Sequence, residues 1–142
     1  MELKWQPIIG FEDYTVSEDG QVKNKKGIAM KTRVDRAGYE RVNLQKGKQK
    51  HTVKVHWAVL STFNPNQNSR QLTIDHIDGD IKNNKVTNLR WCSMGENLRL
   101  QHFRNNEEIL FFIDELKKIY SEDSLSEILK TLLSLARQLK NT

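Results

Sequence analysis

The first 55 residues alternate hydrophobic and polar positions in short runs separated by turn residues. Between residues 8 and 24 two such runs flank Asp19-Gly20, a pair typical of a hairpin turn. Residues 38–44 place Val42 and Leu44 on one side, and a turn at residues 46–48 leads into another alternating run at residues 52–55. The pattern predicts a small antiparallel β-sheet with one solvated face.

The middle of the chain combines one helical and two strand patterns. Residues 56–63 are apolar enough for a short buried helix, which we expect to stop at Asn64-Pro65 because the residue before a proline disfavours helix. Residues 71–77 and 86–92 are strand-like, and a loop rich in Asp, Gly and Asn joins them. A capping box at residues 93–96 then predicts a helix with Asn97 in its first turn.

The C-terminal part carries two amphipathic helical patterns. The first starts with the acidic pair Glu107-Glu108, and a second capping box, Ser124 to Glu127, predicts the start of the other helix. We therefore expect an αα-hairpin, and we hypothesise a homodimer formed through its helices. The apolar positions of the two patterns are Ile109, Phe112, Ile113, Leu116 and Ile119, and Leu125, Ile128, Leu129, Leu132, Ala136 and Leu139.

Length and composition exclude several classes of protein. A chain of 142 residues with 37% hydrophobic content suits one ordinary domain, or two very small units that share a core. The single cysteine, Cys92, allows neither an internal disulfide nor a four-cysteine zinc site. There is no apolar run of membrane-spanning length and no secretion signal, so we expect a soluble protein of the cytoplasm that does not enter membranes.

Positive charge is concentrated in one segment of the chain. Residues 21–54 hold eleven lysines and arginines against only two acids, a local charge of +9 in a protein of net charge +5. Such a segment favours binding of DNA phosphates, although a merely solvated lysine-rich surface explains the charge equally well. The three arginines are the better candidates for reading bases. The candidate DNA-binding residues are Lys23, Lys25, Lys26, Lys31, Arg33, Arg36, Arg41 and Lys48.

Asp75 and His76 carry the chemistry of metal-dependent phosphodiester hydrolysis. An imidazole titrates near neutrality and suits His76 to general-base work, while the Asp75 carboxylate and the Asn97 amide offer oxygen ligands for Mg²⁺ or Mn²⁺. Neighbours on a strand point to opposite faces, so the pair shares a site only if the strand ends or bulges there. Asp78-Gly79-Asp80 favours such an end. By itself an Asp-His pair is more often a local hydrogen-bonding feature.

Two stretches of the chain hold ordered sets of motif residues. The set in the middle of the chain is Val55-His56-Trp57-Ala58-Val59-Leu60, Phe63-Asn64-Pro65-Asn66, Ile74-Asp75-His76-Ile77-Asp78-Gly79-Asp80, Asn83-Asn84, Val86, Asn88-Leu89, Trp91 and Glu96-Asn97. This set resembles the HNH homing-endonuclease family. The set near the N-terminus is Trp5-Gln6-Pro7-Ile8, Gly10-Phe11-Glu12, Tyr14, Val16-Ser17, Gly20, Val22 and Asn24. It resembles the small N-terminal module of phage- and intron-encoded HNH endonucleases.

The resemblance implies an α+β fold with a ββα-metal core. The expected organisation is a basic β-rich DNA-binding module at residues 1–54, the HNH nuclease domain at 55–104 and a helical hairpin tail at 105–142. The tail would serve packing or dimerisation. It is net acidic, whereas relatives of the homing type often end in a basic DNA-reading module.

The resemblance also implies roles for four residues. Asp75 and Asn97 would bind one divalent cation, His76 would be the general base, and Asn88 would hold the loop in shape. The expected function is metal-dependent cleavage of double-stranded DNA, in a bacterial or phage-infected cell.

Two other functions compete with catalysis. One is a non-catalytic DNA-binding or regulatory protein that retains the HNH fold, and the other is an interaction protein that acts through the acidic tail. The presence of all four presumed site residues favours the endonuclease. Of the other histidines, we expect His56 to pack among apolar neighbours and His102 to lie on the helix surface, away from Asn97.

Overall fold

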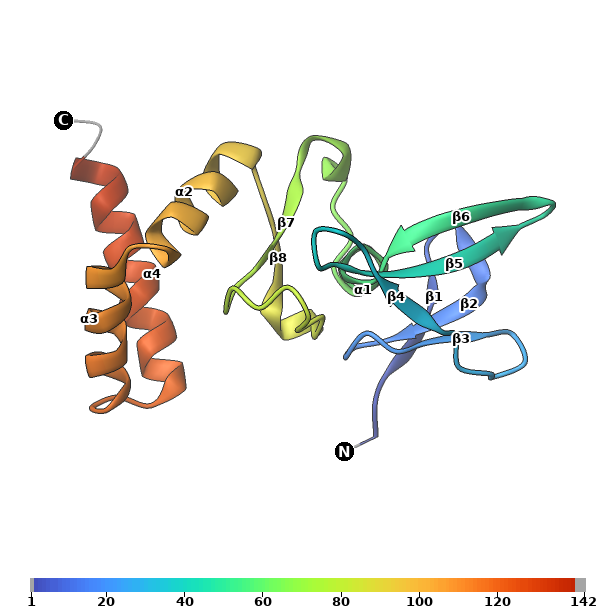
Figure 1. Ribbon diagram of the computed structural model, residues 1–142, viewed down its shortest axis with the longest axis horizontal. Helices are drawn as coiled ribbons and strands as arrows, with labels where there is room; N and C mark the ends of the chain where they lie inside the picture. The colour runs from blue at the N-terminus through green and yellow to red at the C-terminus, as the bar shows by residue number, and fades with distance from the viewer. Residues whose placement is uncertain (1, 140–142) are drawn as a thin grey trace. The chain divides into compact units, whose positions relative to one another are not determined.

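The computed structural model describes residues 2–139, apart from the side chains of residues 107–110 and 132–139. The chain forms two compact units, residues 1–99 and 100–142 (Figure 1). All strand pairs are antiparallel and the chain also forms four α-helices within the described residues, which confirms the α+β class. In the described part of the chain, no helix combines the length and apolarity needed to span a membrane.

The N-terminal sheet consists of β1 (Trp5–Ile8), β2 (Phe11–Ser17) and β3 (Val22–Asn24), in that order. The turn between β2 and β3 falls at the predicted Asp19-Gly20 pair, where Gly20 adopts a φ of 94°. A left-handed conformation favours glycine, since other residues meet a steric penalty there. The predicted hairpin is therefore confirmed.

The second sheet consists of β4 (Thr32–Val34), β5 (Glu40–Lys46) and β6 (Gln49–Lys54). β5 and β6 form the predicted hairpin, and Val42 and Leu44 are buried as their alternation indicates. The sequence pattern missed β4. Three residues are too few to display a period of two, and β4 exists only through its pairing with β5.

The first unit is organised around the buried helix α1 (Val55–Phe63), whose C-cap is Asn64, so it stops at the predicted Asn64-Pro65 pair. α1 contacts β1, β2, β5 and β6 on the sheet side, and β8 (Leu89–Cys92) and the 3₁₀ turn η2 (Val86–Asn88) on the other. Leu60 from α1 lies in one hydrophobic cluster with Ile8, Val16 and Leu44, all fully buried. One core therefore connects both N-terminal sheets with the segment that carries Asp75 and His76.

That segment follows the predicted order of strand, loop, strand and helix. A 3₁₀ turn, η1 (Ser69–Gln71), leads into β7 (Thr73–His76), which pairs antiparallel with β8, and α2 (Met94–Arg104) follows. The Ser93 Oγ accepts the Glu96 backbone N–H at 3.2 Å, as expected of the N-terminal cap.

The strand predicted for residues 86–92 is shorter than expected. Residues 86–88 form η2, because the Val86 backbone N–H donates to the Glu18 carbonyl and the Asn88 side chain turns into the preceding loop. Both interactions involve residues distant in sequence, so periodicity within the segment does not reveal them.

The second unit contains α3 (Glu107–Lys117) and α4 (Glu122–Leu139), which pack on each other and confirm the predicted αα-hairpin. The predicted capping box at Ser124 was wrong. α4 begins two residues earlier, and the Ser121 carbonyl accepts the Leu125 N–H at 3.0 Å, which places Ser124 inside the first turn.

The apolar positions of the hairpin are unequally buried. Leu125 is buried, whereas Phe111 and Ile119 are 69% and 72% exposed, and Phe112 is also exposed. The predicted stripe positions whose side chains lie outside the described residues are Ile109, Leu132, Ala136 and Leu139.

Candidate active site

The pair Asp75-His76 lies at the C-terminal end of β7, and both side chains are buried, 2% and 4% exposed respectively. Directly after His76 the chain turns, and the Gly79 N–H donates to the His76 carbonyl at 2.9 Å. The strand therefore ends at His76, as the sequence analysis required for the two neighbouring side chains to serve one site.

Asp75 forms an ion pair across the β-ribbon. Its cross-strand neighbour on β8 is Arg90, whose Nε donates to the Asp75 Oδ2 at 2.8 Å. A carboxylate that loses its water on burial is stabilised by a charged hydrogen-bond donor. Sequence reasoning did not select Arg90, because only the strand register brings it opposite Asp75.

His76 is held by a chain of polar side chains that reaches back into the second sheet. The Asn84 Oδ1 lies 3.1 Å from the His76 Nε2, and the Asn84 Nδ2 donates to the Glu40 Oε2 at 2.9 Å. The other Glu40 oxygen, Oε1, accepts the Thr32 hydroxyl at 2.8 Å. Asn84 belonged to the sequence motif without a role. Glu40 and Thr32 were missed because they precede Asn84 by 44 and 52 residues.

The His76 ring packs against two other rings. His56 meets it edge to face with centroids 5.2 Å apart, and Tyr39 lies 5.2 Å from His56 and 6.2 Å from His76. Burial first of all, and then the neighbouring His76 and Lys54, lower the pKa of His56 from 6.5 to about 3. His56 is therefore neutral at physiological pH, which agrees with the packing role expected from the sequence.

The loop after His76 is braced by Asn88. The Asn88 Nδ2 donates to the Asp78 Oδ1 and the Asn83 carbonyl, both at 2.9 Å, while its Oδ1 accepts the Asp78 N–H at 3.0 Å. Burial would raise the pKa of Asp78, but hydrogen bonds from Asn83, Asn88 and the Asp80 backbone outweigh it and lower that pKa. The loop thus presents a rigid, anionic turn beside His76.

The predicted metal ligand Asn97 lies half-buried in the first turn of α2, where its N–H donates to the Ser93 carbonyl at 2.9 Å. Within the described residues no group of three or more His, Cys, Asp or Glu side chains is placed to hold a metal. The predicted set, one carboxylate and one amide, is smaller than such a group. Its hard oxygens suit a divalent cation that keeps positions open for further ligands.

Three cations stand in register across the second sheet. Arg33 on β4 pairs with Arg41 on β5, which in turn pairs with Lys54 on β6. Directly paired residues of antiparallel strands share one face, and like charges placed so are mutually unfavourable. An anion bound on this face would relieve that repulsion.

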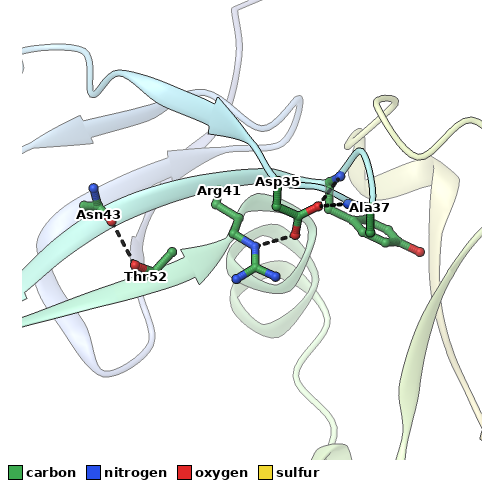
Figure 2. Close-up of polar contacts among 6 residues, drawn as sticks. Asp35, Ala37, Arg41, Asn43 and Thr52 are labelled. Atoms are coloured by element: carbon green, nitrogen blue, oxygen red, sulfur yellow. Dashed lines mark hydrogen bonds and ion pairs between the residues drawn. The ribbon is translucent and has the colours of Figure 1, made fainter.

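Figure 2 shows how the polar side chains on this sheet are fixed. Asp35 accepts the Arg41 Nε and the Ala37 backbone N–H, so it both closes the β4–β5 turn and orients the guanidinium. Further along the same face, the Thr52 Oγ1 donates to the Asn43 Oδ1 at 2.9 Å. The face predicted to be basic and solvated is thus polar and partly preorganised.

The remaining basic candidates are distributed over the edges and turns of both sheets. The Lys23 Nζ lies 3.9 Å from the Trp5 ring centroid, and the Lys25 Nζ lies 3.8 Å from Asp13 in an exposed ion pair. Exposed pairs of this kind contribute little to stability. The other exposed candidates are Lys26, Lys31, Arg33, Arg36 and Lys48.

Comparison with known proteins identifies the family of this chain. Residues 53–99 match the model of an HNH endonuclease family, and residues 4–45 match the NUMOD4 motif. The solved structure described as DNA binding and cleavage by the HNH homing endonuclease I-HmuI is similar, with a TM-score of 0.65 and 34% identity, covering 81% of this chain and 68% of that one. The chain belongs to the HNH endonuclease family.

Curated relatives give the same result. DNA endonuclease I-HmuI of Bacillus phage SP01 is 36% identical over 104 residues, which are 72% of this chain and 59% of the relative. The uncharacterized HNH endonuclease L247 of Acanthamoeba polyphaga mimivirus is 36% identical over 105 residues, 72% of this chain and 26% of the relative. The chain therefore spans less than two thirds of the length of these curated relatives.

Proposed function

We propose that this protein is a metal-dependent endonuclease that hydrolyses phosphodiester bonds of double-stranded DNA. The observation that carries the proposal is the buried Asp75-His76 pair at the end of β7, beside a braced loop, in a chain of the HNH endonuclease family. Its relative I-HmuI is described as a DNA-binding and DNA-cleaving homing endonuclease. We place the activity in the cytoplasm of a bacterial or phage-infected cell, where that substrate lies.

Each site residue has a proposed role. His76 takes the proton of the attacking water, and Asn88 keeps the loop in the shape that leaves the imidazole in place. Asp75 and Asn97 would hold one Mg²⁺ or Mn²⁺, which would supply positive charge to the phosphate and the leaving oxygen. With the 3′ oxygen as leaving group, the product carries a 5′ phosphate.

The basic face of the second sheet is the proposed DNA-binding surface. The aligned cations Arg33, Arg41 and Lys54 and the exposed lysines around them suit neutralisation of phosphates, which gives sequence-independent affinity. Arg33, Arg36 and Arg41 are the proposed base readers because a guanidinium matches a guanine edge with two hydrogen bonds. Asp35 already holds the Arg41 guanidinium in one orientation.

Cleavage that requires a divalent metal is the test of the proposed function. Purified protein should convert supercoiled plasmid or phage DNA into nicked or linear product with Mg²⁺ or Mn²⁺, and EDTA should abolish the reaction. In the same assay Asp75→Asn should lose cleavage at every metal concentration, whereas Asp80→Asn in the exposed part of the loop should keep it. Salt-sensitive DNA binding without cleavage under any of these conditions would support the non-catalytic DNA-binding protein instead.

We further propose that the protein forms a homodimer through its C-terminal helices. The exposed Phe111, Phe112 and Ile119 make a surface that two copies would bury. Two active sites on one duplex would permit a double-strand break, whereas a monomer would nick. Light scattering at micromolar concentration is expected to give the mass of two chains, and a mass near 16.6 kDa would contradict the dimer.

A further inference from the structure

We propose that Glu40, acting through Asn84, fixes the tautomer of His76 with its proton on Nε2 and leaves Nδ1 as the basic nitrogen. Glu40 and Asn84 are positioning residues in this scheme. Its catalytic consequence, that Nδ1 is the atom that accepts the proton of the attacking water, rests on the proposed function of His76 as general base.

The first step is the orientation of the Asn84 amide. An ionised carboxylate only accepts hydrogen bonds, and the two Glu40 oxygens accept from the Thr32 hydroxyl at 2.8 Å and from Asn84 at 2.9 Å. If the amide were reversed, its oxygen would face a carboxylate oxygen at that distance, and two acceptors would repel each other. Glu40 therefore requires the Asn84 NH₂ group on its own side.

The second step is that the orientation of the Asn84 amide determines which nitrogen of His76 carries the proton. With its NH₂ group on Glu40, Asn84 presents its oxygen to the His76 Nε2 at 3.1 Å, and an amide oxygen only accepts. Nε2 must then carry a hydrogen. A neutral imidazole has one ring proton, so Nδ1 keeps its lone pair.

Burial prevents water from replacing the hydrogen bond between Asn84 and His76. Asn84 is 3% exposed and His76 is nearly as buried, so little water reaches the contact to offer another donor or acceptor. The His56 ring lies edge to face with the His76 ring and confines it further. A wrong tautomer would leave two buried polar atoms facing each other without a proton between them.

The N-terminal sheets also confine Asn84 by packing. An ideal Cβ at Gly20, in the β2–β3 turn, would lie 3.0 Å from the Asn84 Cβ and 3.2 Å from a Val55 methyl. The neighbouring Glu18 carbonyl accepts the Val86 N–H at 2.8 Å. The turn of the first sheet and Glu40 of the second therefore meet at Asn84. The N-terminal part of the chain thus positions Asn84 beside His76, in addition to its proposed role in DNA binding.

The variants that test the relay change hydrogen-bonding capacity at constant shape. Glu40→Gln supplies a donor as well as an acceptor, so both orientations of Asn84 become possible and both tautomers of His76 should appear. In the double variant Glu40→Gln/Asn84→Asp, the glutamine donates to a carboxylate that accepts from Nε2, which should restore the single tautomer. Glu12→Gln on the exposed part of β2 is the matched control.

The primary readout is spectroscopic and independent of cleavage. Long-range ¹H–¹⁵N spectra of protein labelled at its histidines, free of DNA and metal, distinguish the two neutral tautomers and also show whether a ring is charged. For neutral His76 we expect only the Nε2–H form in wild type, Glu12→Gln and the double variant, and both forms in Glu40→Gln. A wild-type Nδ1–H form, or a Glu40→Gln spectrum identical to wild type, would overturn the relay.

The kinetic readout tests the catalytic consequence. Loss of an outer hydrogen-bond partner at a metal-dependent site typically costs about 10-fold to 100-fold in activity, so we expect kcat of Glu40→Gln to fall in that range at unchanged KM for DNA. An unchanged kcat beside a mixed tautomer would reject the catalytic part. If wild type cuts no DNA while the spectra behave as expected, the proposed function fails and the tautomer assignment stands.

Discussion

Replacing His76 with alanine is expected to reduce DNA cleavage by about 10²-fold to 10⁴-fold, the range that a general base contributes. The His76 imidazole lies at the end of β7, directly after Asp75, where it can accept the proton of a water bound beside the carboxylate. Water must then lose its proton without assistance, while the basic sheet still binds DNA. Single-turnover cleavage of supercoiled plasmid measures the rate, and salt-dependent DNA binding is expected to be unchanged.

The matched control is His102→Ala, because His102 is exposed on α2 and lies outside the proposed catalytic machinery. It should cleave at nearly the wild-type rate. Circular dichroism of both variants separates loss of chemistry from loss of fold, since His76 is buried. A folded His76→Ala protein with wild-type cleavage would contradict the general-base role and favour another nucleophile-activating group.

Acid should destabilise the protein through His56. Its pKa is about 3 in the folded protein and near 6.5 when unfolded, so between these values the unfolded chain binds more protons. The neutral, buried His56 therefore contributes stability above pH 6.5. This contribution decreases as the pH falls through 6.5 toward 3. Linkage gives a loss of about 1.3 kcal/mol between pH 7 and 5.5, and about 1.2 kcal/mol for each further pH unit down to the folded pKa.

Urea unfolding at pH 7 and 5.5 measures this dependence. His56→Leu keeps a buried apolar group of similar size but cannot bind a proton, so it should lose about 1.3 kcal/mol less than wild type over this interval. His51→Gln on the half-exposed part of β6 should behave like wild type. Equal pH dependence in wild type and His56→Leu would show that His56 is not the titrating group.

Local sequence patterns determined most of the secondary structure. Period-two runs identified both N-terminal hairpins. The Asn64-Pro65 pair marked the C-terminal end of α1, and the Ser93 cap marked the start of α2. Each of these signals acts between residues within a few positions of one another. The resemblance to HNH endonucleases predicted the family, and the comparisons confirm that prediction. The roles of Asp75, His76, Asn88 and Asn97 and the three-module boundaries stay predictions.

Only the tertiary structure decided what surrounds Asp75 and His76. Arg90 reaches Asp75 because β7 and β8 pair in one register, and Glu40 reaches Asn84 across 44 positions of sequence. The same holds for β4, which forms by pairing with β5. Such contacts depend on how the elements pack around α1, and packing is set by the whole core rather than by any local run. The sequence by itself thus determined the family and predicted which residues carry the chemistry, and the fold decided which side chains contact them.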